Sequence, residues 1–220
     1  LHFQSMPSIF AKTSNSTLML SQLKQLFPLF TQGSVSNEIG LYASTTWVDE
    51  AGISHPVMLF QYRYVSDFKV PSPDGKLQKI KEIHRDLWGA FIFQTPTLAF
   101  AASDKRKTFF YPYDFKWHSS DILLNQKINL FGESQQQLAR NLSPSMTLKL
   151  ADFFEKNSGD LVSHVQENVT FFMGEKNLLQ RCNQKHSDDI ANISELRGYL
   201  RTLSLPAYQQ FRQSMLKFLS

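Results

Sequence analysis

Residues 84–87 read His-Arg-Asp-Leu, which is how the catalytic loop of a protein kinase begins. In that loop the aspartate accepts the proton of the substrate hydroxyl, and an asparagine five positions later holds a magnesium ion. This chain has Phe91 at that position and no glycine-rich phosphate loop before it, and its nearest approach to Asp-Phe-Gly is Asp114-Phe115-Lys116. Phosphoryl transfer needs both the metal ligands and the phosphate cradle, so we predict no kinase activity. We interpret residues 84–86 as a solvated lead-in to a buried strand.

The second group that could do chemistry surrounds the single cysteine, Cys182, with His186 one helical turn later and Asp188 and Asp189 beyond it. Zinc needs three or four ligands in tetrahedral reach, and these residues straddle a predicted helix end. We therefore predict no metal site and no cofactor, and interpret Cys182 as a structural thiol that alkylating reagents modify slowly. A single cysteine excludes an intrachain disulfide, which favours a reducing compartment, the cytoplasm.

Nucleophilic catalysis has no local signature in this chain. There is no Gly-x-Ser-x-Gly elbow, and the residues around Cys182 match no protease motif. We therefore assign no catalytic residue. A site assembled only in the folded chain leaves no such pattern, so an enzyme of hydrolase-like type remains an alternative function.

Basic residues are followed by a run of aromatic residues along residues 104–117. Single-stranded nucleic-acid platforms use this combination, because cations follow the backbone while rings stack on bases. The simpler interpretation is a charged hairpin turn that enters a strand with aromatic side chains on both faces, and such a strand must be covered on both sides. The candidate contacts to an anionic surface are Lys105, Arg106 and Lys107.

Composition is that of a packed protein. Of 220 residues 42% are hydrophobic and 13% aromatic, and the formal net charge of +4 is well below that of a dedicated nucleic-acid binder. No apolar run approaches the roughly 20 residues that span a bilayer. Residues 1–5 (LHFQS) resemble the end of a protease site used to remove purification tags, so we treat Met6 as the native start.

The first half of the chain begins with a helix and continues with strands. Apolar residues at three- and four-residue spacing predict a helix over 16–31, which Pro28 should break or kink. Residues 38–48 and 56–65 are rich in β-branched and aromatic residues and predict strands, as does 107–117. Residues 76–87 are ambiguous, and their helical spacing favours a helix over a hairpin return strand.

The second half of the chain has a helical period. We predict helices over 145–157, 160–182, 187–203 and 206–219. The resulting prediction is a single α+β domain over 6–220: an N-terminal helix and a mostly antiparallel sheet to residue 120, with a helical half, 121–220, packed on one face of the sheet.

This layout resembles that of bacterial secretion chaperones and adaptors, which combine an amphipathic N-terminal helix (compare 16–31), a twisted antiparallel sheet (compare 38–117) and C-terminal helical packing (compare 205–219). No residue motif carries the resemblance. Secretion chaperones are typically smaller and acidic, whereas this chain is larger and basic; adaptors of type IV secretion coupling complexes vary more in size.

The resemblance implies a cytoplasmic bacterial protein that recruits effectors for virulence, docks on a partner subunit and presents client proteins without catalysing a reaction. Strand addition at a sheet edge and a helix laid in a groove are the two binding modes that suit such a layout. Buried aromatic anchors would supply the affinity. The residues we predict for this role are Trp47, Phe110, Tyr111, Tyr113 and Trp117.

Overall fold

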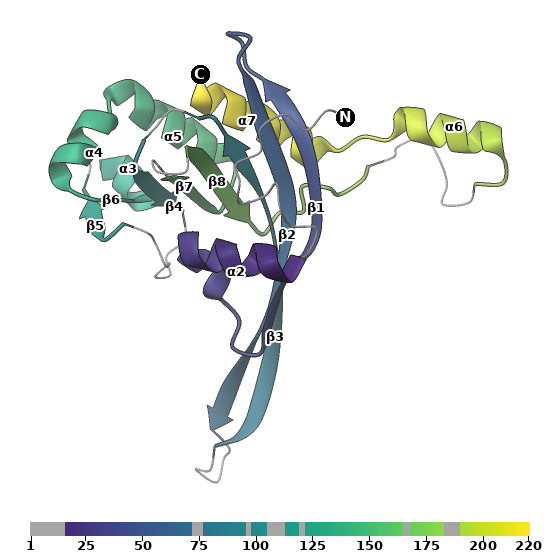
Figure 1. Ribbon diagram of the computed structural model, residues 1–220, viewed down its shortest axis with the longest axis horizontal. Helices are drawn as coiled ribbons and strands as arrows, with labels where there is room; N and C mark the ends of the chain where they lie inside the picture. Colours follow the sequence, from purple (N-terminus) through teal and green to yellow (C-terminus); the bar gives the residue numbers. More distant parts are fainter. Residues whose placement is uncertain are drawn as a thin grey trace.

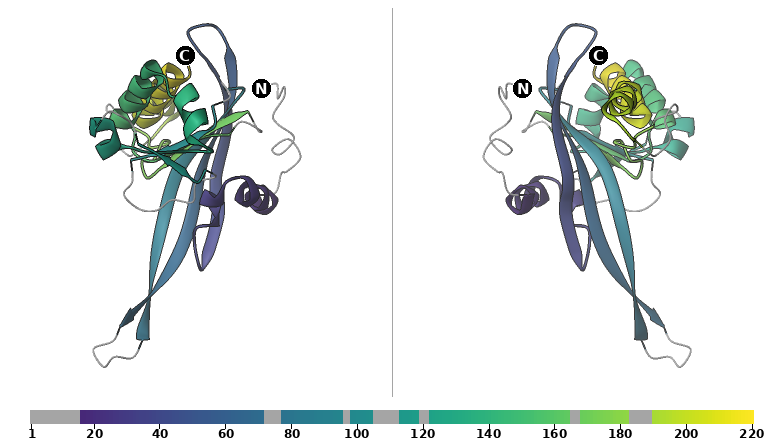
Figure 2. Two further views of the ribbon diagram at one scale, coloured as in Figure 1. Left: turned by 90° about the vertical axis from the view of Figure 1, so that its left-hand side faces the viewer. Right: turned by 90° about the vertical axis from the view of Figure 1, so that its right-hand side faces the viewer.

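The computed structural model describes residues 16–71, 77–95, 98–104, 113–118, 122–164, 168–182 and 190–220. Over these residues the chain forms an eight-stranded antiparallel sheet in the order β1-β2-β3-β8-β7-β4-β6-β5. Helices lie on both faces of the sheet, as the two side views in Figure 2 show. The predicted α+β class, with an N-terminal helix, an antiparallel sheet and C-terminal helices, is confirmed.

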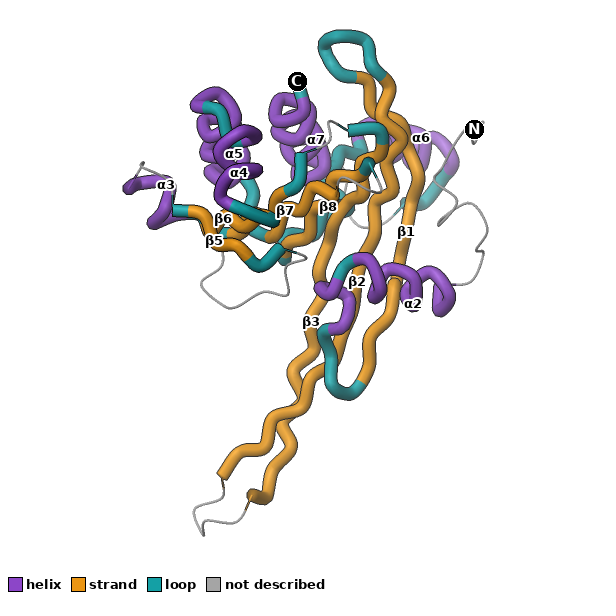
Figure 3. Tube along the Cα trace, turned by 60° about the vertical axis from the view of Figure 1, so that its left-hand side comes forward, coloured by secondary structure: helices purple, strands orange, loops and turns teal. Residues whose placement is uncertain are grey.

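The first three strands form a long meander. They are β1 (Ser36–Val48), β2 (Ser54–Pro71) and β3 (Leu77–Phe93). The residues that pack into the core lie in the first half of β2 and in β3 from Leu87 onward, with Ile39 and Trp47 from β1. The outer parts of β2 and β3 project from the body as a two-stranded ribbon (Figures 1 and 3).

The prediction of a helix over 76–87 is wrong, because this segment is the outer part of β3. It pairs with β2 through Arg63↔Asp86, Tyr64↔Arg85 and Val65↔His84. Side chains on both faces are exposed over residues 84–86. A strand that is solvated on both faces does not need to alternate polar and apolar residues. The apolar residues of this segment have helical spacing by chance, and that spacing led to the wrong prediction.

Five short strands complete the same sheet, and the last three of them lie within residues 121–220, so this part of the chain is not the helical half that we predicted. The short strands are β4 (Phe100–Ser103), β5 (Phe115–Trp117), β6 (Asn129–Gly132), β7 (Asp160–His164) and β8 (Val169–Gly174). The predicted helix over 160–182 is wrong: its first part is the β7–β8 hairpin in the centre of the sheet. All six residues of β8 are buried, so both faces are apolar and the strand shows no alternation. Of the predicted strand 107–117, residues 105–112 lie outside the described residues.

The helices divide between the two faces of the sheet. Those in the described ranges are α2 (Ser16–Leu26), the 3₁₀ helix η1 (Pro28–Thr31), α3 (Ile122–Lys127), α4 (Gln135–Asn141), α5 (Pro144–Lys156), α6 (Ile193–Thr202) and α7 (Pro206–Leu219). The break predicted at Pro28 is where α2 gives way to η1. The C-terminal helices α5 and α7 cover one face of the sheet, as predicted, while α2 and η1 cover the other (Figure 2).

Each face of the sheet has its own aromatic core. Beneath α2 and η1, Phe27 and Phe30 stack against Phe91 and Phe171. Beneath α5 and α7, Phe211 packs against Phe172 at a ring-centroid distance of 5.0 Å. Each fully buried Phe contributes about 1.5–3 kcal/mol relative to an exposed one, so the two cores together hold the sheet between its two helical layers.

Candidate functional site

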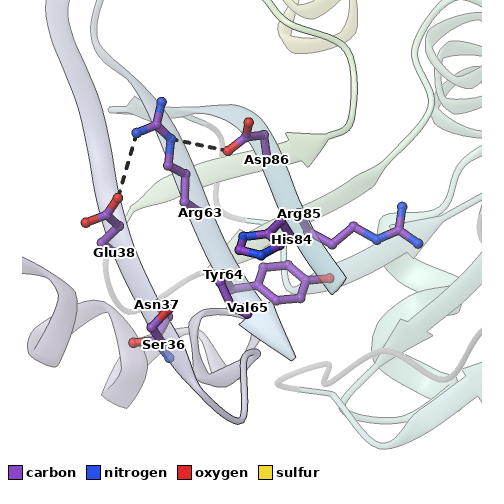
Figure 4. Close-up of a pocket in the computed structure, with 9 residues that line it drawn as sticks. All are labelled: Ser36, Asn37, Glu38, Arg63, Tyr64, Val65, His84, Arg85 and Asp86. Atoms are coloured by element: carbon purple, nitrogen blue, oxygen red, sulfur yellow. Dashed lines mark ion pairs between the residues drawn. The ribbon is translucent and has the colours of Figure 1, made fainter. Parts of the chain in front are cut away.

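The His-Arg-Asp tripeptide lines a shallow depression on the exposed part of the meander (Figure 4). Its volume is about 320 Å³. Three charged residues form a row across β1, β2 and β3: the Arg63 guanidinium lies 3.2 Å from the Asp86 carboxylate and 3.8 Å from the Glu38 carboxylate. Nearby, Arg85 pairs with Glu175 at 3.7 Å. Both arginines of this depression, Arg63 and Arg85, therefore have a carboxylate within ion-pair distance.

The charged groups of this depression are largely exposed to solvent. Its ion pairs are largely solvated, and such pairs contribute at most about 1 kcal/mol. Within the described ranges no three His, Cys, Asp or Glu side chains converge as a metal site would require. Residues 84–86 are exposed and the strand becomes buried from Leu87 onward, which confirms their interpretation as a solvated lead-in.

The structure places the predicted aromatic anchors inside the fold or outside the described residues. Trp47 is buried, and its Nε1–H donates to the Tyr208 hydroxyl oxygen at 2.9 Å. The buried Tyr113 hydroxyl donates to the Ser163 carbonyl at 2.6 Å, and burial raises the pKa of this phenol. Trp117 is partly buried against the core beneath α5 and α7. Phe110 and Tyr111 lie outside the described residues, as do the predicted anionic contacts Lys105, Arg106 and Lys107.

Trp47 and Tyr113 are therefore residues of the core, and a partner does not reach them in this conformation. The physical reason is that the sheet is covered on both faces: Trp47, on β1, packs into the core beneath α5 and α7, and Tyr113, just before β5, packs into the core beneath α2 and η1.

Cys182 stands at the base of a protruding arm. Its backbone forms an isolated bridge with Ser204: the Cys182 N–H donates to the Ser204 carbonyl at 2.9 Å, and the Ser204 N–H donates back at 3.0 Å. The thiol is partly buried. Its proposed companions His186, Asp188 and Asp189 lie outside the described residues. The backbone of Cys182 thus joins the two chain segments that flank the arm through its hydrogen bonds with Ser204.

The arm ends in α6, which stands apart from the sheet and from the other helices (Figure 1). Its first turn is capped reciprocally: the Glu195 N–H donates to the Asn192 side-chain oxygen at 2.9 Å, while the Glu195 carboxylate accepts from the Ala191 N–H at 2.8 Å. These bonds satisfy backbone donors that a helix start leaves open. Local bonds thus stabilise α6 where packing does not, because none of its residues is buried.

The outward face of α6 is an apolar stripe. Ile193, Leu196, Leu200 and Leu203 recur at spacings of three, four and three residues, the pattern by which one helix packs along another. The side chains of Ile193, Leu196 and Leu200 are 70%, 42% and 58% exposed. The helix predicted over 187–203 is therefore present, but sequence reasoning missed that its apolar face is uncovered. We call these four residues the α6 stripe.

A buried pair that sequence reasoning also missed closes the β1–β2 turn. The Asp49 carboxylate accepts from the Ile53 N–H at 2.8 Å and lies 3.3 Å from His55 Nε2. The Ile53 hydrogen bond and the neighbouring His55 lower the pKa of this carboxyl. The available signal was the turn sequence beginning at Asp49, because Asp side chains commonly bond backbone N–H groups in turns.

Comparison with known proteins adds no family. The chain matches no protein-family profile, and the searches of curated proteins and of solved structures found no protein similar to it. In the part of the chain that the structure describes, no helix has both the length and the apolar character needed to cross a membrane. The class that fold and site define is an α+β protein with an exposed amphipathic helix.

Proposed function

We propose that this chain is a non-catalytic protein-binding adaptor that docks on a partner subunit and presents client proteins. The observation that carries the proposal is the α6 stripe, three of whose four residues are largely exposed on a capped helix. Leaving such a stripe in water forgoes the free energy that its burial would give, and contiguous exposed apolar surface marks interaction sites. The resemblance of the predicted layout to bacterial secretion chaperones and adaptors favours clients that are exported from the cytoplasm.

The partner that fits α6 is an amphipathic helix with acidic residues beside its own apolar stripe. Arg197 and Arg201 are exposed and lie one helical turn apart along one border of the α6 stripe. Acidic side chains on the facing helix would pair with them, as charged flanks do in coiled coils. Two copies of α6 would fit less well, because antiparallel pairing brings Arg197 of one against Arg197 of the other.

Synthetic helices test this proposal directly. One fluorescent peptide has three heptads with Leu at the core positions and Glu at the flanking positions; a second peptide replaces every Glu with Lys. We expect the Glu peptide to bind at least about tenfold more tightly than the Lys peptide, measured by anisotropy at low salt. Equal binding of the two peptides would contradict the acidic partner.

Variants of α6 locate the binding. Leu196→Ser with Leu200→Ser should weaken binding of the Glu peptide at least about tenfold, because the variant removes the anchors of the contact. The matched control is Leu148→Ser, since Leu148 on α5 is 68% exposed and outside the α6 stripe. Unchanged binding in the double variant, or equal loss in the control, would remove α6 as the binding element.

A further inference from the structure

The two edges of the sheet differ in how they are protected. β5, at one edge, has only three residues and carries Lys116. β1, at the other edge, has 13 residues, and its segment 39–48 contains neither a charged residue nor a proline. Proteins normally blunt an edge by shortening it or by adding charge or proline, because free N–H and C=O groups pair with any available strand. β5 has this protection. In β1, Glu38 and the register shift between Ile39 and Leu41 lie at one end, and segment 41–48 has neither charge, proline nor register shift.

Hydrogen bonding shows which residues of β1 face the free edge. The Asp49 N–H donates to the Ile53 carbonyl at 3.0 Å, so residue 49 faces β2. Residues of an antiparallel strand alternate in this respect, and the register between 41 and 48 is continuous. Pro56 lies opposite Thr46 and has no N–H. This fits a pair whose backbone groups do not bond each other across β1 and β2. The residues that direct N–H and C=O groups outward are therefore Tyr42, Ser44, Thr46 and Val48.

Two exposed side chains of β1, Tyr42 and Val48, would form a favourable pair between two antiparallel copies of this strand. Tyr42 is 51% exposed and Val48 is 49% exposed, and an even spacing places both on the same face of the strand. An aromatic residue opposite a β-branched residue is a favourable cross-strand pair. An antiparallel copy of β1, related by a twofold axis through Thr45, would place each Tyr42 opposite Val48 of the other copy.

We propose that two copies of this chain pair through β1 to form one continuous sheet with its twofold axis at Thr45. The register joins residues 42–48 of both copies through about eight backbone hydrogen bonds. Self-pairing brings no like charges together in this segment, because residues 39–48 are uncharged. At the end of the register Leu41 meets Asp49, whose carboxylate is already bonded within its own turn. This dimer does not depend on what α6 binds.

A disulfide tests the axis. In this register residue 45 of each copy forms a non-hydrogen-bonded pair with a Cα separation of about 4.5 Å, which a disulfide spans. In a Cys182→Ser background, Thr45→Cys should form a covalent dimer under mild oxidation. The matched control, Ser44→Cys, should not, because residue 44 lies opposite residue 46 and its two copies are about 7–8 Å apart. A Thr45→Cys protein that stays monomeric, or equal cross-linking of the two variants, would overturn the register.

Charge exchange tests the interface without a covalent bond. Tyr42→Lys and Val48→Glu should each weaken the dimer at least about tenfold in sedimentation equilibrium, because each places two charges against apolar partners. An equimolar mixture should recover a dimer, since Lys at position 42 of one chain then meets Glu at position 48 of the other. Wild-type protein that remains monomeric at every soluble concentration, or a mixture that does not recover, would overturn the proposal.

The α6 double variant separates the two binding elements. Leu196→Ser with Leu200→Ser should leave dimer dissociation unchanged within about twofold, because β1 is intact. Loss of the dimer in this variant would assign self-association to α6 and overturn pairing through β1. Loss of peptide binding with the dimer retained would support a dimer that presents two independent α6 helices.

Discussion

Helices α6 and α7 follow one another in the chain and carry the same kind of apolar stripe, yet only one of the two stripes is covered. α7 buries Phe211, Met215 and Phe218 against the sheet. α6 buries no residue and holds its first turn with a reciprocal cap instead. A periodic apolar pattern therefore identifies the face of a helix that needs a partner, but it does not say whether the partner belongs to the same chain.

The difference also separates stability from binding. Removing a buried side chain leaves a cavity and loses packing, whereas removing an exposed one changes little in the free chain. Substitutions in α7 should therefore reduce the free energy of unfolding, while substitutions in α6 should change binding alone. Four predictions test this contrast, from the largest expected effect to the smallest.

The largest effect is expected at Phe211. Its ring packs between Trp47 at 5.9 Å and Phe172 at 5.0 Å, measured between centroids. Phe211→Ala should lower the free energy of unfolding by about 3–5 kcal/mol in urea denaturation. Phe211→Leu fills most of the same space and should cost less. A loss below about 1 kcal/mol for the alanine variant would mean that α7 packs as loosely as α6.

Alkaline pH should destabilise the body of the protein. The buried Tyr62 hydroxyl lies 2.9 Å from the Phe30 carbonyl and 2.7 Å from the Gln32 carbonyl and shares its one proton between them, and burial raises the pKa of this phenol. Its proton is held more tightly in the folded state than in the unfolded state, where the pKa is about 10. The stabilisation is therefore complete below about pH 10 and is lost as the pH rises toward the folded pKa.

Urea denaturation between pH 8 and pH 11 measures this loss. Tyr62→Phe should be less stable at pH 8 by about 1–3 kcal/mol, because the buried Phe30 carbonyl and the partly buried Gln32 carbonyl lose their shared donor. Above pH 10 its stability should fall less steeply than that of wild type. Equal slopes in the two proteins would show that Tyr62 ionises as easily in the folded state as in the unfolded one.

Sequence reasoning found the elements whose two faces differ. The helix over 16–31 and the strands over 38–48 and 56–65 correspond to α2 with η1, to β1 and to β2. In α2, Leu20 and Leu23 face the core while Ser21 and Gln25 face solvent. That asymmetry is what a periodic pattern records.

Elements with two similar faces were missed for opposite reasons. Residues 84–86 of β3 are exposed on both faces and β8 is buried on both, so neither alternates. A related point concerns Trp47 and Tyr113, which are buried within this chain. Aromatic content indicates that a side chain will be buried, but not whether its own chain or a partner buries it. The exposure of the α6 stripe could not be predicted either, because a periodic apolar pattern does not show which chain covers it.

The cap of α6 should have a local effect. Asn192→Ala removes the side-chain acceptor for the Glu195 N–H and should destabilise α6 by about 1 kcal/mol. Amide exchange in α6 should accelerate about fivefold, with the global free energy of unfolding unchanged. The matched control is Ser143→Ala, which removes the corresponding cap of α5 and should lower global stability by a similar amount, because α5 is packed on the sheet. A global loss in both variants would show that α6 unfolds with the body.

The smallest effect is expected at Leu200, in the middle of the α6 stripe. Leu200→Ala should change the free energy of unfolding by less than about 0.5 kcal/mol, because its side chain is exposed and Ala is a good helix former. The matched control, Leu150→Ala in α5, removes a fully buried leucine and should cost about 2–5 kcal/mol. If Leu200→Ala were as costly as the control, the α6 stripe would already be covered within the free protein. A near-zero effect leaves binding as the property through which this leucine acts.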